Sequence, residues 1–318
     1  MEHLDQLRMM TKVARLYHTR GMRQTEIGER LRISQSRVSR LLQQAEDAGI
    51  VRTVVSVPQG LHAELEEAVE LEYGVAEVHV VDAVANDEVE LARDLGHATA
   101  FLLSELTTAA PVIAFTSWSQ TLRQAVDALQ VLHSDTGYVV ETLGDLGPPL
   151  LQHEAARSTQ RLASLSGGRP VFLRTPGVVA SPQIREALLA QDPYARQALE
   201  MLDDVDIALV GIGSVDVAPW LKAGDNYFTE RQLANIRAQG AVGEVCLRFI
   251  DEDGNHIASD LDDLVIGISP DQLKRARRRW AVAGGERKLD AIKAALRGGW
   301  VDVFVTDAQT AERIAKRA

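Results

Sequence analysis

The chain has 318 residues and a formal net charge of −11, and 46% of its residues are hydrophobic while 25% are charged. This composition is that of a globular protein, so it excludes collagen-like and generally disordered chains. Because the length exceeds the roughly 100 to 200 residues of one domain, we expect two domains.

The single cysteine, Cys246, excludes an internal disulfide and a cysteine-based zinc site, and it fits a reducing compartment. The chain opens with Met1-Glu2-His3, which lacks the order of charged and apolar residues of a secretory signal. No run of about 18 apolar residues is present that could cross a membrane. We therefore expect a cytoplasmic protein without a membrane partner.

Charge is divided unevenly along the chain. Residues 1–60 carry ten Lys and Arg against six Asp and Glu, a net of +4, which leaves −15 for the other 258 residues. Because phosphate attraction is needed only where a protein meets DNA, a basic head on an acidic body is typical of a modular DNA-binding protein. Chance asymmetry is the alternative interpretation.

Residues 1–57 show the pattern of a small helical DNA-binding domain. The spacing of apolar residues predicts a first helix over residues 4–20, closed by Gly21, and a short second helix over residues 24–31. After a three-residue break, Ser34 is a favourable N-cap for a third helix. Two short helices joined by a tight turn describe a helix-turn-helix.

The opening turn of the third helix carries polar side chains that suit base edges and phosphates. Gln can pair with adenine and Arg with guanine in a bidentate manner, while Ser hydroxyls and the helix N-terminus can bind phosphate oxygens. A three-helix bundle with a solvated polar face is the alternative interpretation. The DNA-binding residues that we predict are Thr25, Ser34, Gln35, Ser36, Arg37, Ser39 and Arg40.

Residues 50–57 form a β-prone run that resembles the wing or exit strand of a winged helix. Residues 58–75 continue with leucines and acids at helical spacing, so we predict a linker helix there. The pattern alone leaves open whether this helix dimerises or packs against its own body.

Residues 76–318 alternate apolar β-prone runs with helical stretches, which is typical of an open α/β sheet. We also expect a hairpin that pairs residues 244–250 with residues 256–259 across a turn at residues 251–255. In open α/β sheets, ligands bind beyond the carboxyl ends of the strands. The candidate strands are residues 77–81, 111–115, 138–142, 170–173, 205–210, 264–268 and 301–305.

Four polar or glycine-rich loops follow these runs. They comprise residues 116–122, 144–149, 211–214 and 283–288. In the last loop two glycines free backbone amides to face an anion, and Lys288 lies in the first turn of the next helix. A phosphate would fit there, and a plain tight turn with a surface lysine is the alternative.

No motif of a nucleotide-binding or hydrolytic enzyme occurs in the chain. The sequence lacks GxGxxG, a Walker A loop, HExxH and GxSxG. Its eight histidines are scattered singly, and no pair of carboxylates stands out. The sequence therefore indicates no cofactor, no metal site and no catalytic residues.

Several short motifs occur in order along nearly the whole chain. In the head they are Gln24-Thr25-Glu26-Ile27, Ile33-Ser34, Val38–Leu42 and Ala48–Val51. In the body they include Ser117-Trp118 with Thr121-Leu122, Val210–Ser214, Gly240–Glu244, Val265–Ile268, Ala283–Gly285 with Lys288, and Val305–Asp307. Their order and spacing resemble the SorC family of sugar-responsive bacterial transcriptional regulators.

The resemblance implies an effector domain similar to phosphosugar isomerases and deaminases, which binds a phosphorylated sugar or polyol in a homotetramer, a dimer of dimers. It implies that Lys288 binds the phosphate and that Glu244 binds a sugar hydroxyl. Ser119 stands where the family's Ser-Trp-Gly pattern usually has glycine, so its hydroxyl could narrow the pocket or add a hydrogen bond. The effector-binding residues that we predict are Ser117, Ser119, Gln120, Thr121, Gly144, Gly213, Glu244, Gly284, Gly285 and Lys288.

The leading function is a transcriptional regulator of a carbohydrate or polyol catabolic operon, whose affinity for double-stranded operator DNA depends on a phosphosugar. A sugar-phosphate isomerase or deaminase with a DNA-binding appendage is the second hypothesis, which the lack of an acid–base pair near Lys288 disfavours. A constitutive DNA-binding or scaffolding protein with a degenerate pocket is the third. The domains that we predict are residues 1–57, 58–75 and 76–318.

Overall fold

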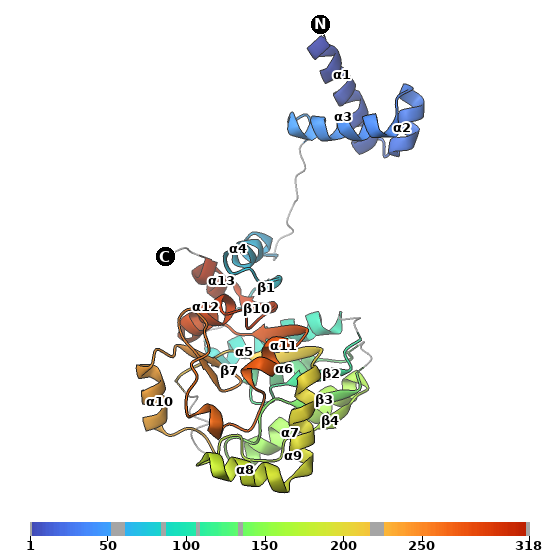
Figure 1. The fold of residues 1–318 in the computed structure, drawn as a ribbon. Helices are drawn as coiled ribbons and strands as arrows, with labels where there is room; N and C mark the ends of the chain where they lie inside the picture. Colours follow the sequence, from blue (N-terminus) through green and yellow to red (C-terminus); the bar gives the residue numbers. More distant parts are fainter. Residues whose placement is uncertain are drawn as a thin grey trace. The chain divides into compact units, whose positions relative to one another are not determined.

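The computed structural model describes residues 2–51, 61–83, 87–105, 109–132, 136–216 and 226–315. The chain divides into two compact units, Met1–Pro58 and Gln59–Ala318, which we call the head and the body (Figure 1). Among the described residues, no helix combines the length and the apolar character that a membrane span requires.

The head is a helix-turn-helix, as the sequence predicts. Its first helix is α1 (Glu2–Ala14), which continues as one π-helical stretch (Arg15–Thr19) and is followed by α2 (Gln24–Leu31) and α3 (Gln35–Asp47). The core lies between the three helices and includes Val13, Ile27 and Val38, which are fully buried.

The turn between α2 and α3 explains why the third helix begins where it does. Arg32 ends α2 with a left-handed backbone (φ 53°), and the amide of Ile33 donates to the carbonyl of Gly28 (2.9 Å). Ser34 then caps α3, because its hydroxyl accepts from the amide of Arg37 (3.3 Å). The wing is predicted for residues 50–57, and residues 52–57 of this range lie outside the described part of the chain.

The body contains one fully parallel seven-stranded sheet, which confirms the open α/β fold. Its strand order is β1-β10-β9-β5-β2-β3-β4. All carboxyl ends therefore lie at one edge of the sheet. The strands are β1 (Glu77–Val81), β2 (Val112–Phe115), β3 (Tyr138–Glu141), β4 (Arg169–Val171), β5 (Ile207–Gly211), β9 (Arg278–Val282) and β10 (Val303–Asp307).

One strand prediction is wrong, and one strand of the seven-stranded sheet was not predicted. Residues 264–268 form only isolated bridges, Val178 to Val265 and Leu143 to Gly267, and no strand. A short apolar run does not distinguish a buried loop from a strand, and this one is a buried loop. Strand β9 lies between β10 and β5 instead. It begins with two arginines, so its sequence does not have the apolar pattern by which the other strands were predicted.

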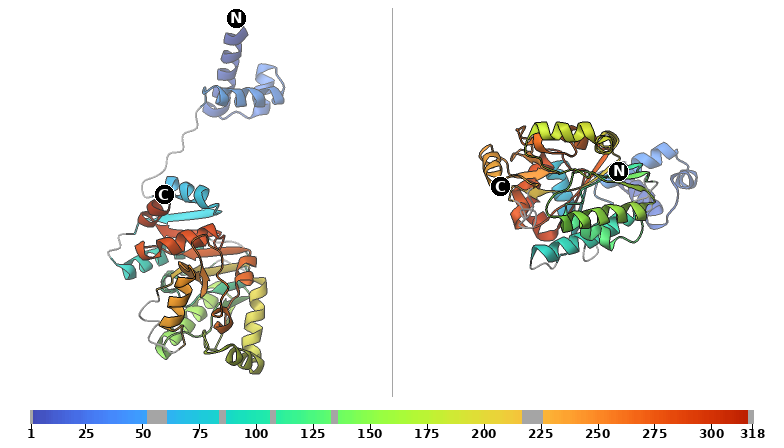
Figure 2. Two further views of the ribbon diagram at one scale, coloured as in Figure 1. Left: turned by 60° about the vertical axis from the view of Figure 1, so that its left-hand side comes forward. Right: turned by 90° about the horizontal axis from the view of Figure 1, so that it is seen from below.

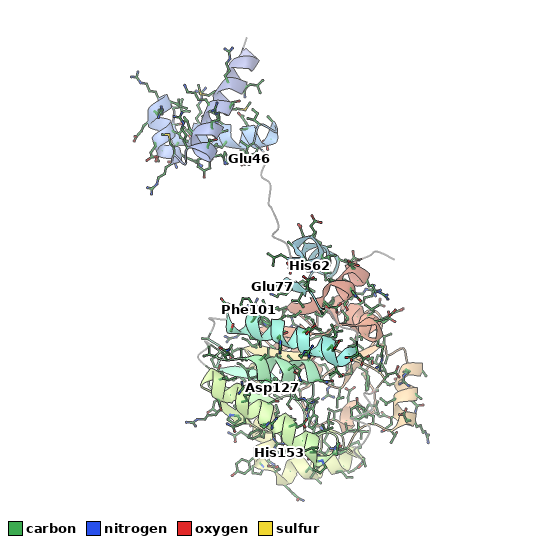
Figure 3. The ribbon with its side chains drawn as sticks, turned by 180° about the vertical axis from the view of Figure 1, so that it is seen from behind. Glu46, His62, Glu77, Phe101, Asp127 and His153 are labelled. Atoms are coloured by element: carbon green, nitrogen blue, oxygen red, sulfur yellow. The ribbon has the colours of Figure 1, made fainter. Side chains whose placement is uncertain are left out.

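Successive residues of each strand face opposite layers of helices. In β2, Ile113 and Phe115 pack against one layer, whereas Ala114 packs against the other. Figures 2 and 3 show the first layer, with α5, α6 and α7 side by side over one face of the sheet. The body helices are α4 (Ala63–Tyr73), α5 (Glu88–Ser104), α6 (Gln120–Ala128), α7 (Pro149–Ser166), α8 (Pro182–Gln191), α9 (Pro193–Met201), α10 (Glu230–Ala238), α11 (Pro270–Arg275), α12 (Leu289–Arg297) and α13 (Ala308–Ala315).

The linker helix α4 packs against its own body. The carboxylates of Glu66 and Glu70 accept hydrogen bonds from the amides of Val80 (2.9 Å) and Val78 (2.8 Å) on edge strand β1. An edge strand otherwise offers its free amides to other chains. The two glutamates therefore close this edge and fix α4 to the sheet.

The hairpin that forms is not the predicted one, because its turn lies inside the predicted first strand, residues 244–250. Strands β7 (Gly243–Val245) and β8 (Arg248–Ile250) are joined by Cys246 and Leu247, which both have left-handed backbones (φ 54° and 61°). The predicted turn at residues 251–255 produces only a single bridge from Ile250 to His256. Residues 246–247 lack the Asn-Gly or Asp-Gly pair typical of such a two-residue turn, so the pattern missed it.

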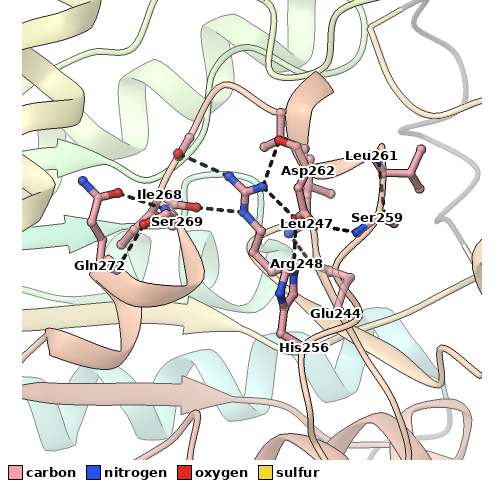
Figure 4. A network of polar contacts seen from close by, with 12 residues as sticks. Glu244, Leu247, Arg248, His256, Ser259, Leu261, Asp262, Ile268, Ser269 and Gln272 are labelled. Carbon is pink, nitrogen blue, oxygen red and sulfur yellow. Dashed lines mark hydrogen bonds and ion pairs between the residues drawn. The ribbon is translucent and has the colours of Figure 1, made fainter. Parts of the chain in front are cut away.

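Arg248 holds the hairpin against the neighbouring buried loop (Figure 4). Its guanidinium donates to the carbonyl of Ile268 (2.9 Å) and pairs with the carboxylate of Asp262 (3.0 Å), which also contacts His256 (3.1 Å). A buried arginine needs such partners because an unpaired buried charge is strongly destabilising. The network fixes the position of β7, whose central residue is Glu244.

We expect Glu70→Ala to lower the free energy of unfolding by about 1 kcal/mol, because the buried amide of Val78 loses its acceptor. Glu70→Gln is the matched control, since its amide oxygen can still accept. Urea unfolding measures both variants. Equal destabilisation of the two variants would show that the charge, and not the hydrogen bond, is what matters.

Candidate functional site

The head presents its predicted DNA-binding side chains to solvent. Among them, Ser34 and Ser36 contact each other through their hydroxyls (3.0 Å), and the guanidinium of Arg40 donates to the carbonyl of Ser36 (3.4 Å). The first turn of α3 contains no acid that could repel phosphate. The exposed residues are Thr25, Ser34, Gln35, Ser36, Arg37, Ser39 and Arg40.

Arg37 has no ion pair or side-chain hydrogen bond within the described residues. It is exposed on α3, whereas its neighbours Val38 and Leu41 are buried in the core of the head. A guanidinium in this position is free to contact a base edge or a phosphate. DNA binding by these residues stays a prediction.

The body contains a cavity of about 560 Å³ beyond the carboxyl ends of β2, β5, β9 and β10. This is the position at which open α/β sheets bind ligands. The structure brings eight of the ten predicted effector residues to its wall, namely Ser119, Gln120, Thr121, Gly213, Glu244, Gly284, Gly285 and Lys288.

The other two predicted residues do not line the cavity. The Ser117 side chain is buried, and its hydroxyl has no hydrogen-bond partner among the described residues. Gly144 packs into the buried loop, where its amide donates to the carbonyl of Ile266 (3.0 Å). Their chain neighbours do reach the cavity, since Thr116 and Trp118 flank Ser117 and Leu143 precedes Gly144.

Lys288 contributes a positive charge to the cavity wall. Its ammonium group has no hydrogen bond or ion pair among the described residues, whereas Arg287 pairs with Glu88 (2.9 Å) and Arg313 with Glu286 (2.7 Å). Burial lowers the pKa of Lys288, and the negative charge of Glu244 opposes this shift. A partly buried, unpaired ammonium group is suited to an anionic ligand.

Glu244 reaches the cavity from strand β7. A side chain at Gly213, opposite it on β6 (Gly213–Ser214), would collide with its carboxylate, so glycine leaves it room. One carboxylate oxygen accepts from the amide of Leu247 (2.6 Å). Burial raises the pKa of Glu244, while the Leu247 amide and the charge of Lys288 lower it. The other oxygen can accept from a ligand hydroxyl.

Ser119 serves as the N-cap of α6. Its hydroxyl accepts from the amide of Leu122 (3.3 Å), and Gln120 and Thr121 form the first helical turn at the cavity wall. The serine that departs from the family pattern thus has a local structural role.

Two residues that the site prediction missed hold the glycine loop. The amide of Gly285 donates to the hydroxyl of Thr310 (2.8 Å), which in turn donates to the carboxylate of Asp307 (2.6 Å). Asp307 ends strand β10, and both residues line the cavity. The signal that could have found Asp307 is its position two residues after the predicted strand 301–305.

The wall also contains the single cysteine. The thiol of Cys246 lies 3.3 Å from the hydroxyl of Thr116, and burial raises the pKa of the thiol to about 11. It is therefore protonated at neutral pH and is not an activated nucleophile. Among the described residues, no group of three His, Cys, Asp or Glu is arranged to hold a metal ion.

The two parts of the chain match two family models. Residues 58–316 match Sugar-bind, described as "Putative sugar-binding domain", and residues 13–60 match MarR_2, described as "MarR family". The first match covers most of the body and the second covers most of the head.

Relatives match along the full length of the chain. The sequence is 31% identical over 312 residues to the deoxyribonucleoside regulator of Bacillus subtilis (strain 168), covering 98% of both chains. It is 27% identical to the sorbitol operon regulator of Klebsiella pneumoniae, covering 99% of this chain and 100% of that one. The crystal structure of full-length SorC from Klebsiella pneumoniae has a TM-score of 0.67 at 25% identity, covering 98% and 100% of the two chains.

We expect Cys246 in the folded chain to react slowly with a thiol reagent such as iodoacetamide, because it is buried and carries a raised pKa. At pH 9 a thiol with a pKa of about 11 is only about 1% ionised, so raising the pH from 7 to 9 should leave labelling slow. Mass spectrometry measures the labelled fraction, and the guanidinium-unfolded chain is the control. Fast, complete labelling of the folded chain would contradict this environment.

Proposed function

The chain belongs to the SorC family of sugar-binding transcriptional regulators, and we propose that it regulates a carbohydrate or polyol catabolic operon. Residues 1–57 are its DNA-binding domain, residues 58–75 its linker and residues 76–318 its effector domain. The observation that carries this proposal is that eight residues for which effector binding was expected line one cavity.

The charges of the cavity favour an effector with one anionic group and several hydroxyls. Lys288 is available to the anion, while Glu244 and the hydroxyl of Thr121 can bond to hydroxyl groups. The arginines at the wall are already paired with glutamates, which leaves little attraction for a second anionic group. A phosphorylated sugar or polyol has this chemistry.

The regulatory step that we propose is thermodynamic linkage. Effector binding favours one arrangement of paired heads, and operator affinity changes by the same coupling free energy. Helix-turn-helix proteins read two half-sites about 34 Å apart, so at least two heads must act together. We propose a homotetramer, built as a dimer of dimers, in the cytoplasm.

We propose that the cavity binds rather than converts its ligand. General acid–base catalysis needs groups free to exchange protons with the substrate. Asp307 accepts two hydrogen bonds from Thr310, and Glu244 accepts one from the Leu247 amide. Product formation from a sugar phosphate, followed by chromatography, would favour the rival proposal of an isomerase or deaminase.

A thermal-shift screen of sugars, polyols and their phosphate esters tests the effector class. We expect stabilisation by phosphate esters, because a ligand at about one hundred times its dissociation constant adds about 2.7 kcal/mol. Lys288→Ala should abolish this shift. Stabilisation by an unphosphorylated polyol, unchanged in Lys288→Ala, would contradict the anion site.

Two single variants separate DNA binding from effector binding. Arg37→Ala should weaken binding to a DNA fragment selected from the chain's own genome by about 1 to 3 kcal/mol and leave the thermal shift intact. Lys288→Ala should keep DNA binding and lose the response to the ester. Gel-shift and thermal-shift measurements on both variants provide the comparison. Loss of both activities in either variant would contradict the assignment of separate sites.

A further inference from the structure

We propose that helix α13 carries effector occupancy to the linker helix α4, and that the trigger is competition for the amide of Gly285. Thr310 accepts a hydrogen bond from this amide, and the anionic group of a bound effector takes its place. The inference rests on the proposed function, because it requires an anion at the loop Gly284–Lys288.

At the cavity, three hydrogen bonds link Gly285, Thr310 and Asp307. Gly285 donates its amide to the Thr310 hydroxyl (2.8 Å), and Asp307 accepts both the hydroxyl (2.6 Å) and the amide (2.9 Å) of Thr310. Thr310 and Asp307 are only 2% and 5% exposed. A backbone amide has one hydrogen to donate, so an effector oxygen can bond to Gly285 only if Thr310 releases it.

The electrostatics favour release when an anion arrives. A hydrogen bond from an amide to an ionised oxygen is stronger than one to a neutral hydroxyl. Lys288 supplies the countercharge for the anion, whereas the Asp307 carboxylate packs directly against Gly284. An anion at the glycine loop is therefore attracted by Lys288 and repelled by Asp307. Because Asp307 anchors the start of α13, the repulsion acts on this helix.

The linker end of the route begins in the same short helix. Ile314 lies one turn beyond Thr310 on α13, and its carbonyl accepts a hydrogen bond from the hydroxyl of Tyr73 on α4 (2.9 Å). The side chains of Ile314 and Val69 are buried in one core cluster, where α13 packs along α4. A shift at the start of α13 is thus transmitted through a packed interface rather than through a loop.

A second connection joins the same two places. Strand β10 ends at Asp307 and pairs along its length with β1, whose amides are held by Glu66 and Glu70 of α4. Helix α4 therefore contacts α13 directly and is connected to β10 through β1. It is also the first described helix after the head in chain order, which makes it the element through which the body can influence the head.

Hydrogen–deuterium exchange of the full chain, with inorganic phosphate as the probe, tests the coupling. Phosphate at tens of millimolar supplies the anion without a sugar, and chloride matches the ionic strength. We expect phosphate to increase exchange in peptides that cover α13 and α4 while the remaining sheet keeps its protection. Calorimetric titration with phosphate measures binding independently.

Variants of Thr310 separate competition from simple packing. Thr310→Val keeps the shape but removes the hydroxyl, so phosphate should bind roughly five-fold tighter and α4 should no longer respond. Thr310→Ser retains the hydroxyl and should behave like the wild type. Tyr73→Phe should leave phosphate affinity unchanged and reduce the response of α4 alone.

Each outcome has a distinct meaning. Absence of phosphate binding in the wild type overturns both the proposed function and the coupling. Phosphate binding with unchanged exchange in α4 overturns the coupling and leaves the anion site standing. A normal response in Thr310→Val overturns the competition. If that variant fails to fold, the wild type and Tyr73→Phe still decide whether α13 and α4 respond together.

Discussion

The parallel register of four neighbouring strands is the constraint on which the effector cavity depends. Because β10, β9, β5 and β2 all run in the same direction, the loops that follow them begin at one edge of the sheet. Residues nearly two hundred positions apart, such as Ser119 and Asp307, meet there without long connections. Strand β9 is central to this arrangement, since the glycine loop and Lys288 begin where it ends.

Two ionisable side chains at the cavity wall are desolvated by burial. Lys288 and Glu244 are both withdrawn from water, and burial shifts the pKa of each toward its neutral form. Desolvating ionisable groups without close partners reduces stability. A binding site can retain such groups because the ligand later supplies the missing partner. Two other cations at the wall, Arg287 and Arg313, are exposed and pair with glutamates, so they do not need a ligand as a partner.

The sequence predicted those parts of the molecule that local patterns determine. Helical spacing and the cap at Ser34 identified the head, and β-prone runs identified six of the seven strands. Strand β9 was missed because tertiary pairing, not apolar alternation, makes Arg278 and Arg279 part of a strand. The bond from Gly285 to Thr310 joins residues 25 positions apart, so no local pattern contains it. The left-handed turn at Cys246 lacks the glycine that normally marks such turns.

A count of charged residues identifies the head as the DNA-binding part only when the ion pairs between side chains are considered as well. The body also contains a basic run, but its arginines pair with carboxylates at or shortly before the amino ends of β1, β5 and β10. The pairs are Arg275 with Asp203, Arg277 with Asp206, Arg278 with Glu77 and Arg279 with Asp302. These pairs lie at the sheet edge opposite the cavity and neutralise the run. On the head, by contrast, Arg37 is exposed without such a partner among the described residues. Phosphate attraction requires uncompensated positive charge, so the head and not the arginine run has the electrostatics of a DNA-binding surface.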